Sequence, residues 1–214
     1  MSQTLPQNLP LIEPGKRALV AGRTGCGKST LARWLLKRSP GHWVIINPKH
    51  TAAYDKLPDM NKIDGKDLGK LERSIKKFKF TVVNTVSSNH KYLDDLVSYL
   101  HAQYENLGLC VDELYTMHNH GIAGEGLLAW LTRGRELKQS FLGLTQRPAW
   151  LSQFLFSESD YICEMQLGLL KDRKRMYDMT EQAIMLDKLP EHYWVWYDIN
   201  ADSIRSFGPV PKNS

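Results

Sequence analysis

The nine residues from position 22 to position 30 constrain the fold more than any other part of this sequence. They read Gly-Arg-Thr-Gly-Cys-Gly-Lys-Ser-Thr and follow directly on an apolar segment, Arg17–Ala21. In this pattern, G-x-x-x-x-G-K-[ST], glycines let a loop curl so that consecutive backbone N–H groups face bound phosphates. The segment therefore predicts a strand, a phosphate-binding loop and a helix whose N-terminus adds its positive end.

The residue types of the loop predict distinct roles. We expect the ammonium group of Lys28 to reach the β- and γ-phosphates of a nucleotide and the hydroxyl group of Ser29 to bind Mg²⁺. ATP and Mg²⁺ are therefore the predicted cofactors. The predicted nucleotide-binding residues are Gly22, Arg23, Thr24, Gly25, Cys26, Gly27, Lys28, Ser29 and Thr30.

A second apolar segment ends in two acids, as the Walker B motif of ATPases does. Leu107–Val111 is followed by Asp112 and Glu113. At the end of a central strand, Asp112 would hold a water molecule on Mg²⁺, and Glu113 would polarise the water that attacks the γ-phosphate. Two adjacent acids can also simply end a strand at the surface. Beside a phosphate-binding loop, the pair favours an ATP-hydrolysing site.

The segment Phe141–Thr145 predicts a further strand with a polar end. Gln146 follows Thr145 there, before Pro148. If this strand lies between the two motif strands, as in the additional-strand ATPases, Gln146 would face the γ-phosphate. Alternatively, Thr145 and Gln146 only open the turn that precedes the proline.

Two arginines, Arg133 and Arg135, lie near the end of the helix predicted over Leu127–Leu137. A ring-shaped ATPase uses such an arginine in trans, where its guanidinium group stabilises charge that develops on a neighbour's γ-phosphate. Either arginine could instead be a solvated side chain that the helix dipole favours.

Apolar runs alternate with helical patterns along the chain. Near-continuous apolar runs are typical of strands buried on both faces, and their alternation with helices predicts a parallel sheet with right-handed crossovers. The other predicted strands are Trp43–Asn47, Phe80–Val83 and Tyr161–Met165, and the other predicted helices are Lys28–Lys37, Leu68–Lys77 and Tyr92–Glu105. The predicted fold class is α/β: an additional-strand, RecA-like P-loop NTPase with a central, mostly parallel sheet flanked by helices.

We expect residues 1–214 to form a single P-loop ATPase domain, because no repeat or low-complexity tract divides the sequence. Residues 1–15, with three prolines, are predicted to form an extended N-terminal arm. Residues 191–210 are predicted to form a C-terminal β-hairpin, since two β-rich runs flank the turn-forming residues Asn200, Ala201 and Asp202.

Composition excludes several classes of protein. With 42% hydrophobic residues among 214, the chain buries a core without disulfides, and its three cysteines are expected to be reduced thiols. No apolar run approaches the roughly 18 residues of a membrane span, and the N-terminus does not resemble a secretory signal, so a cytoplasmic location is expected. The formal net charge of +5 permits a polyanionic partner.

Together, the phosphate-binding loop, the Asp112-Glu113 pair, the arginine-bearing helix end and the tetrad Thr145-Gln146-Arg147-Pro148 resemble the FtsK–HerA superfamily of DNA-translocating ATPases. The resemblance covers about Ala18 to Val210. The short chain is most similar to the genome-packaging ATPases of membrane-containing icosahedral viruses.

The resemblance implies a function: an ATP-hydrolysing motor that packages viral double-stranded DNA into a preformed capsid. It implies a homohexameric ring with duplex DNA in its pore, a capsid or membrane vertex protein as partner, and association with the virion besides the host cytoplasm. Catalytic roles are implied for Lys28, Asp112, Glu113 and Gln146, and metal binding for Ser29 and Asp112. Arg135 is the preferred arginine in trans, with Arg133 and Arg147 as alternatives.

The DNA contact and the kind of motor stay open at this stage. The basic runs 70–79 and 171–175 are candidate phosphate contacts, although such runs are more often solvated faces. The loops 48–58 and 115–125, beyond the ends of predicted strands, are equally plausible linings of the DNA pore. A conjugation or plasmid-mobilisation motor, a filamentous-phage-like assembly ATPase and a small-molecule kinase are the alternatives. The kinase gives no reason for the Asp112-Glu113 pair.

Overall fold

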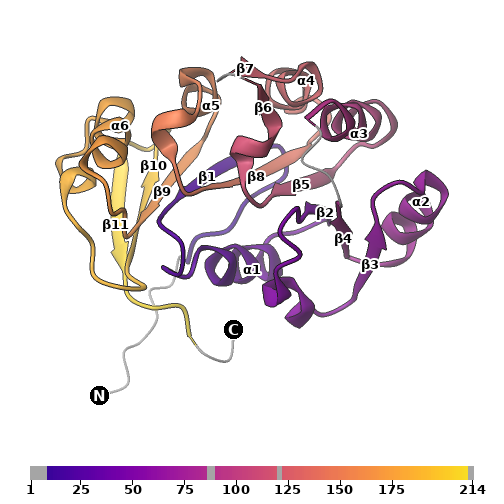
Figure 1. The fold of residues 1–214 in the computed structure, drawn as a ribbon, viewed down its shortest axis with the longest axis horizontal. Helices are drawn as coiled ribbons and strands as arrows, with labels where there is room; N and C mark the ends of the chain where they lie inside the picture. The colour runs from indigo at the N-terminus through magenta and orange to yellow at the C-terminus, as the bar shows by residue number, and fades with distance from the viewer. Residues whose placement is uncertain (1–8, 86–89, 120–121, 212–214) are drawn as a thin grey trace.

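A nine-stranded sheet forms the centre of the computed structural model, which describes residues 9–85, 90–119 and 122–211 (Figure 1). The strand order is β11-β10-β9-β1-β8-β5-β2-β4-β3. The strands from β9 to β3 run parallel, whereas β10 is antiparallel to β9 and to β11. The bounds are β1 Arg17–Ala21, β2 His42–Ile46, β3 Met60–Asp64, β4 Phe80–Asn84, β5 Leu107–Val111, β8 Ser140–Thr145, β9 Tyr161–Met165, β10 Trp194–Asp198 and β11 Ser203–Phe207.

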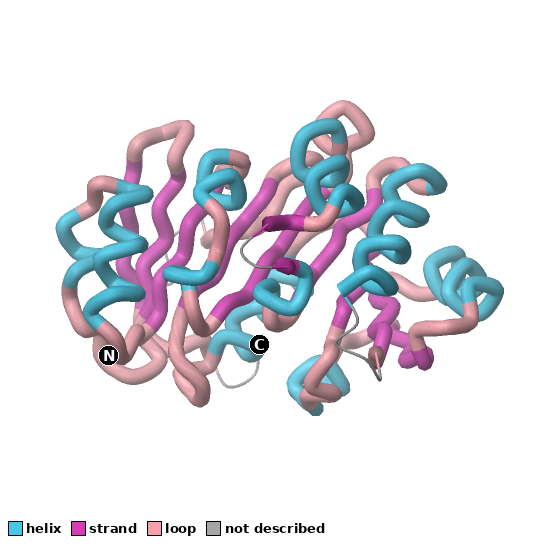
Figure 2. The backbone as a smooth tube through the Cα atoms, turned by 45° about the horizontal axis from the view of Figure 1, so that its top comes forward, coloured by secondary structure: helices cyan, strands magenta, loops and turns pink. Residues whose placement is uncertain are grey.

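Helices cover both faces of this sheet and divide the core in two (Figures 1 and 2). On one face, α1 and the 3₁₀ helix η1 pack on the sheet, and on the other face α2 to α6 do so. The helices are α1 Lys28–Arg38, α2 Leu68–Lys77, α3 His90–Gln103, α4 Glu125–Arg133, α5 Gln153–Ser157 and α6 Leu170–Thr180. The 3₁₀ helices are η1 Ala52–Lys56, η2 Leu114–Met117, η3 Pro148–Trp150 and η4 Ala183–Leu186, and a short ribbon pairs β6 His118–Asn119 with β7 Ile122–Ala123.

The predicted α/β fold is confirmed, including the position of β8 between β1 and β5. All five residues of β1 and of β5 are buried, which explains their near-continuous apolar sequences. Packing between β5 and the neighbouring strand β2 leaves no room at Gly108, where an added Cβ would lie 2.2 Å from the indole ring of Trp43. The predicted C-terminal hairpin is present as β10 and β11, with Trp194 opposite Phe207.

Three elements differ from the prediction. The helix predicted over 127–137 begins at Glu125 and ends at Arg133, because Gly134 follows and the chain turns through Lys138, at φ 54°, into β8. The sequence did not predict β3, an edge strand in which only Ile63 is buried. It also did not predict α6, where Met176 is the one buried apolar residue.

The N-terminal segment, the cysteines and the lengths of the helices also bear on predictions from the sequence. Residues 1–8 of the predicted arm lie outside the described part, and Leu9 to Glu13 contain neither helix nor strand. All three cysteines are buried free thiols, as expected. None of the helices in the described ranges combines the length and the apolar character of a transmembrane span.

Candidate active site

The loop after β1, which the sequence predicts to bind phosphates, lies at the carboxyl edge of the sheet. Gly25 and Gly27 have φ angles of 79° and 100°, which residues with a side chain rarely adopt. The loop is tied to both neighbouring strands, because the N–H of Gly22 donates to the Thr145 carbonyl at 3.0 Å and that of Arg23 to the Gln166 carbonyl at 2.8 Å. The first N–H groups of α1, which begins at Lys28, lack partners within the helix and suit an anion.

An open hollow of about 320 Å³ lies beside this loop. The structure brings most of the predicted nucleotide-site residues together around it. Its walls are formed by Thr24, Gly25, Gly27, Lys28, Ser29, Thr30, Lys49, Thr51, Ala53, Asp112, Glu113 and Gln146. Gly22, Arg23 and Cys26, also predicted to bind nucleotide, do not line it.

Lys28 and Ser29 occupy the expected positions in the hollow. The ammonium group of Lys28 donates to the carbonyl of Arg23 at 3.0 Å and so arches over the loop. Burial lowers the pKa of Lys28, and the carboxylates of Glu113 and Asp112 oppose that shift. The hydroxyl group of Ser29 donates to Oδ2 of Asp112 at 3.2 Å across the gap between α1 and β5.

The side chains of Ser29 and Asp112 fit a magnesium ion. The hydroxyl group of Tyr54 also donates to Oδ2 of Asp112, at 3.1 Å. Burial raises the pKa of Asp112, and the hydrogen bond from Tyr54 opposes that rise. Within the described ranges, no group of three or more His, Cys, Asp or Glu residues could hold a metal ion. Mg²⁺ does not need such a cage, since it retains water and phosphate ligands beside one or two protein oxygens.

Glu113 has an unusual backbone and an incompletely paired side chain. Its φ of 71° lies in the left-handed region, where strain is stored at functional sites. Its Oε1 accepts from the ammonium group of Lys49 at 2.5 Å and from the amide of Gln146. Its Oε2 is buried without a hydrogen-bond partner among the residues that the structure describes. A carboxylate with one oxygen held and the other free suits a group that accepts a proton.

Gln146 connects the loop to Glu113. Its side-chain oxygen accepts from the hydroxyl group of Thr24, and its amide nitrogen donates to Glu113. Gln146 follows β8, which lies between the loop strand and the Glu113 strand. The predicted placement of a polar side chain between the two motifs is therefore present in the structure.

Sequence reasoning missed the contribution of the segment after β2. Lys49, Thr51 and Ala53 line the hollow, and Tyr54 contacts Asp112. These residues were assigned only to a candidate DNA-contact loop, 48–58. Because β2 runs parallel to β5, the loop after β2 emerges at the same carboxyl edge as Asp112 and Glu113. The prediction of a parallel sheet was therefore the signal that could have placed this loop at the site.

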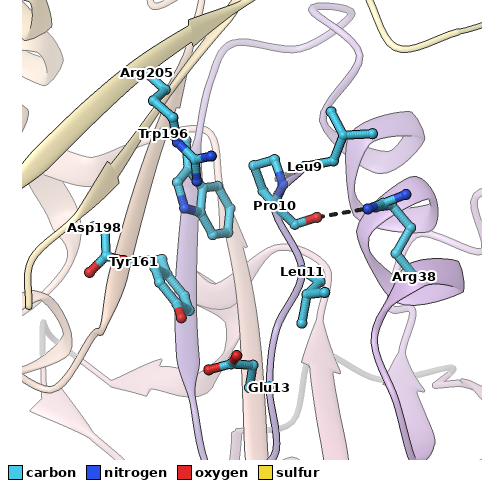
Figure 3. A pocket seen from close by; sticks show the side chains of 9 residues that line it. All are labelled: Leu9, Pro10, Leu11, Glu13, Arg38, Tyr161, Trp196, Asp198 and Arg205. Carbon is cyan, nitrogen blue, oxygen red and sulfur yellow. Dashed lines mark hydrogen bonds between the residues drawn. The ribbon is translucent and has the colours of Figure 1, made fainter. Parts of the chain in front are cut away.

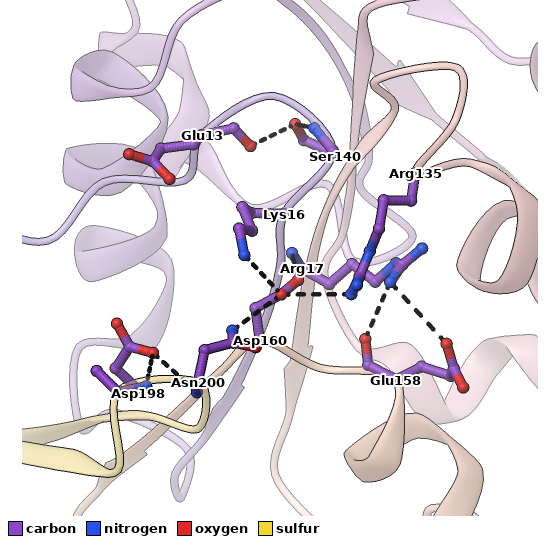
Figure 4. Close-up of polar contacts among 11 residues, drawn as sticks. Glu13, Lys16, Arg17, Arg135, Ser140, Glu158, Asp160, Asp198 and Asn200 are labelled. Atoms are coloured by element: carbon purple, nitrogen blue, oxygen red, sulfur yellow. Dashed lines mark hydrogen bonds and ion pairs between the residues drawn. The ribbon is translucent and has the colours of Figure 1, made fainter.

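The predicted arginines do not line the hollow of their own chain, and Figure 4 shows Arg135 beside Asp160 and Arg17. Arg135 pairs with Asp160 at 3.3 Å, beside Arg17 at the start of β1 and thus at the amino edge of the sheet. Arg133 is exposed at the end of α4. Arg147 pairs with Asp172 at 3.3 Å and lies over the Trp150 ring. A role for Arg133 or Arg135 in trans stays a prediction.

Two further hollows lie on the α1 face of the sheet. One, of about 360 Å³, shares Gly27 and Thr30 with the loop and is closed by Met165, His192 and the segment 209–211. The other, of about 470 Å³, lies between the N-terminal segment, α1 and the hairpin, with Tyr161 and Trp196 stacked at 5.0 Å (Figure 3). The second hollow shares no lining residue with the loop.

Comparison with known proteins gives a consistent result. No family model matches the sequence. The DNA packaging ATPase P9 of Enterobacteria phage PRD1 is 29% identical over 209 residues, which cover 92% of this chain and 88% of that protein.

Solved structures share the fold. The genome packaging NTPase B204 from Sulfolobus turreted icosahedral virus 2, in complex with ATP-gammaS, has a TM-score of 0.74 at 18% identity, covering 92% of this chain and 99% of that one. VirB4 of Thermoanaerobacter pseudethanolicus has a TM-score of 0.66 at 10% identity, covering 91% and 89%. The resemblance carried by the motifs is thus confirmed: the chain is similar in sequence to a viral DNA packaging ATPase and shares the fold of a viral genome packaging NTPase.

Proposed function

We propose that this chain is the ATP-hydrolysing motor that packages the double-stranded DNA of a virus into a preformed capsid. The observation that carries the proposal is the convergence of Lys28, Ser29, Asp112, Glu113 and Gln146 on one hollow at the carboxyl edge of the sheet. The relationship to P9, a DNA packaging ATPase, supports the substrate and the task.

The side chains in the hollow suit each part of ATP hydrolysis. The loop N–H groups and Lys28 would bind and orient the phosphates, and Ser29 and Asp112 would hold Mg²⁺, which neutralises charge on the β- and γ-phosphates when bound. Oε2 of Glu113 would take a proton from the attacking water, whose oxygen bonds to the γ-phosphorus as the bond to the bridging oxygen breaks. ADP and inorganic phosphate leave, and Gln146, which contacts both the loop and Glu113, would link the two.

The adjoining hollow of about 360 Å³ suits the adenosine part of the nucleotide. It begins at Gly27 and Thr30, where the phosphates would end, and its walls combine apolar and ring side chains of Met165, His192 and Pro209. The ring of His192 contacts the carbonyl of Cys26 at 3.1 Å, which joins this wall to the loop.

The proposal includes a ring in which Arg135 reaches the nucleotide of the neighbouring subunit. The side chain of Arg135 is 59% exposed and lies at the opposite edge of the sheet from its own loop. An arginine that acts on a neighbour must be accessible at the surface of its own subunit, as Arg135 is. Six subunits would surround duplex DNA, and attachment to a capsid or membrane vertex protein would place the ring in the virion.

The test measures ATP turnover and assembly of the full chain with and without duplex DNA. We expect ring assembly and a DNA-stimulated ATPase, and we expect Glu113→Gln to bind ATP but to lose turnover by about 1,000-fold. A protein that stays monomeric, and whose turnover ignores duplex DNA, would contradict the motor.

Mixed rings test the trans arginine. Arg135→Ala and Glu113→Gln should each be inactive alone, but their mixture should recover part of the wild-type activity, because some interfaces then pair an intact Arg135 with an intact Glu113. Arg133→Ala, tested in the same mixture, separates the two candidate arginines, since Arg133 lies two residues away at the end of α4. Full activity of Arg135→Ala alone would eliminate this residue.

A further inference from the structure

The loop that follows β2 is held in one conformation by a buried asparagine. Asn47 is completely buried, and its side-chain oxygen accepts from the N–H of Thr51 at 3.0 Å. Its amide nitrogen donates to the Thr51 carbonyl at 3.2 Å and to Oδ1 of Asn84 at 3.1 Å. His50, at φ 51°, is anchored through its ring to the Thr85 carbonyl at 3.1 Å. The position of Lys49 is therefore set by a closed, anchored loop.

From this loop, Lys49 reaches the buried carboxylate of Glu113. Its ammonium group lies 2.5 Å from Oε1, and its side chain is 49% exposed, against 4% for Glu113. Burial alone would lower the pKa of Lys49, but the hydrogen bond and the charge of Glu113 outweigh it and raise that pKa. The lysine is thus a fixed cation beside a carboxylate that burial would otherwise leave poorly stabilised.

Both donors to Glu113 contact the same oxygen. Lys49 and the amide of Gln146 converge on Oε1, and Oε2 has no partner within the described ranges. Two donors on one oxygen fix the plane and the rotation of the carboxylate without covering the other oxygen. The same segment also supplies Tyr54 to Asp112, so it contacts both acids of the Asp112-Glu113 pair.

We infer that Lys49 is a positioning residue for ATP hydrolysis, which holds Glu113 so that its free oxygen faces the attacking water. The inference rests on the proposed function, because it takes Glu113 as the group that accepts the proton. It also adds to the interpretation of residues 48–58: the part of this loop that carries Lys49 belongs to the hydrolytic site. A group that orients the catalytic carboxylate acts on turnover and leaves nucleotide binding largely intact.

Steady-state kinetics of the full chain tests the inference. For Lys49→Met we expect kcat to fall by on the order of 10- to 100-fold, with KM for ATP and the thermal unfolding midpoint little changed. Lys49→Arg, which keeps the charge and a donor, should recover most of the activity. The matched control is Lys62→Met. Lys62 lies on β3 and pairs with Asp55, which belongs to the same segment as Lys49, but Lys62 does not line the hollow. Its kcat should equal that of the wild type.

A double variant separates this inference from the proposed function. If Lys49 acts through Glu113, Lys49→Met should change turnover little further in a Glu113→Gln chain. Three results would overturn the inference: unchanged or increased kcat in Lys49→Met, a loss that lies in KM, or no recovery with Lys49→Arg. Wild-type turnover by Glu113→Gln itself would instead overturn the proposed role of Glu113. Should Lys49→Met not fold, Lys49→Gln carries the same expectation.

Discussion

Asp160 and Glu113 are both almost fully buried carboxylates, one at the amino edge of the sheet and one at the carboxyl edge. Asp160 uses both oxygens: Oδ2 accepts from the backbone N–H of Arg17, and Oδ1 accepts from Lys16, Arg135 and Asn200 (Figure 4). Among the residues that the structure describes, Glu113 has donors on one oxygen only, and its backbone is left-handed. A carboxylate whose two oxygens both accept hydrogen bonds holds parts of the chain together. A buried carboxylate oxygen without a partner, beside a hollow, is instead typical of a reactive group.

Among the residues that hold these two carboxylates, the largest effect is expected at Gln146, which links Glu113 to the loop. Gln146→Ala removes the contacts to both Thr24 and Glu113, so we expect kcat to fall by about 100-fold while the chain stays folded. Asn200→Ala is the control at the other edge, since it removes a side-chain amide from Asp160. Steady-state ATPase rates measure both, and a similar loss of turnover in the two variants would break the comparison.

At the amino edge, the same logic predicts a loss of stability. Asp160→Asn removes the charge that holds Lys16 and Arg135, close to the buried guanidinium group of Arg17. Burial lowers the pKa of Arg17, and Asp160 opposes that shift. We expect the free energy of unfolding to fall by about 3 kcal/mol, as measured by urea denaturation. Glu158→Gln should cost far less, because Glu158 is 31% exposed and lies 3.9 Å from Arg17. Equal losses in the two variants would contradict the assignment.

The contrast between these edges also explains what the sequence could predict. The loop, the Asp112-Glu113 pair and Gln146 each follow a buried strand, so apolar runs and local glycines were sufficient to place them at one edge. Lys49 and Tyr54 could not be found in this way, because they contact residues 64 and 58 positions away and depend on a loop that Asn47 closes. No local pattern records such a closure.

The fold was predictable to a similar extent and for the same reason. Strands buried on both faces have continuous apolar sequences, but β3 at the edge of the sheet does not. The pair between Arg135 and Asp160 was also hidden, because the helix was expected to continue past Arg133 and the turn at Gly134 was not recognised.

Glu164 tests whether a buried carboxylate without partners marks function wherever it occurs. It lies on β9, is fully buried, and has no hydrogen-bond partner on either oxygen among the described residues. Burial raises its pKa to about 9, with Arg173 opposing and Asp187 adding to the rise. It lines none of the three hollows described above, so we expect a cost in stability and no role in turnover.

The expected pH dependence follows from that raised pKa. The folded chain keeps the Glu164 proton up to about pH 9, whereas the unfolded chain releases it near the ordinary value, so stability falls as pH rises between the two. Glu164→Gln removes this loss of stability. The free energy of unfolding of the variant, relative to that of the wild type, should therefore rise by up to about 1.4 kcal/mol per pH unit. Denaturation at pH 6 and pH 8 measures the change. Asp95→Asn, at a 62% exposed side chain, is the control, and a pH-independent difference for Glu164→Gln would contradict the prediction.

The smallest effect concerns the hydrogen bond that Tyr54 donates to Asp112. Burial, together with Cys110 and Asp112, raises the pKa of Tyr54 well above its ordinary value, so the phenol stays protonated and remains a donor across the working pH range. Tyr54→Phe keeps the buried ring but leaves Oδ2 of Asp112 to Ser29 alone. We expect the apparent Mg²⁺ affinity to fall about fivefold, which corresponds to about 1 kcal/mol for one hydrogen bond.

A Mg²⁺ titration of ATP turnover at saturating ATP measures this effect. Tyr99→Phe is a matched control, because Tyr99 also donates to a carboxylate, that of Glu72, but lies on α3 outside the hollow. If only Tyr54→Phe requires more Mg²⁺, the segment after β2 supports Asp112 as well as Glu113, and the carboxyl edge is organised by one segment. If the two variants behave alike, Tyr54 only packs beneath the site, and the organising role of the segment is confined to Lys49.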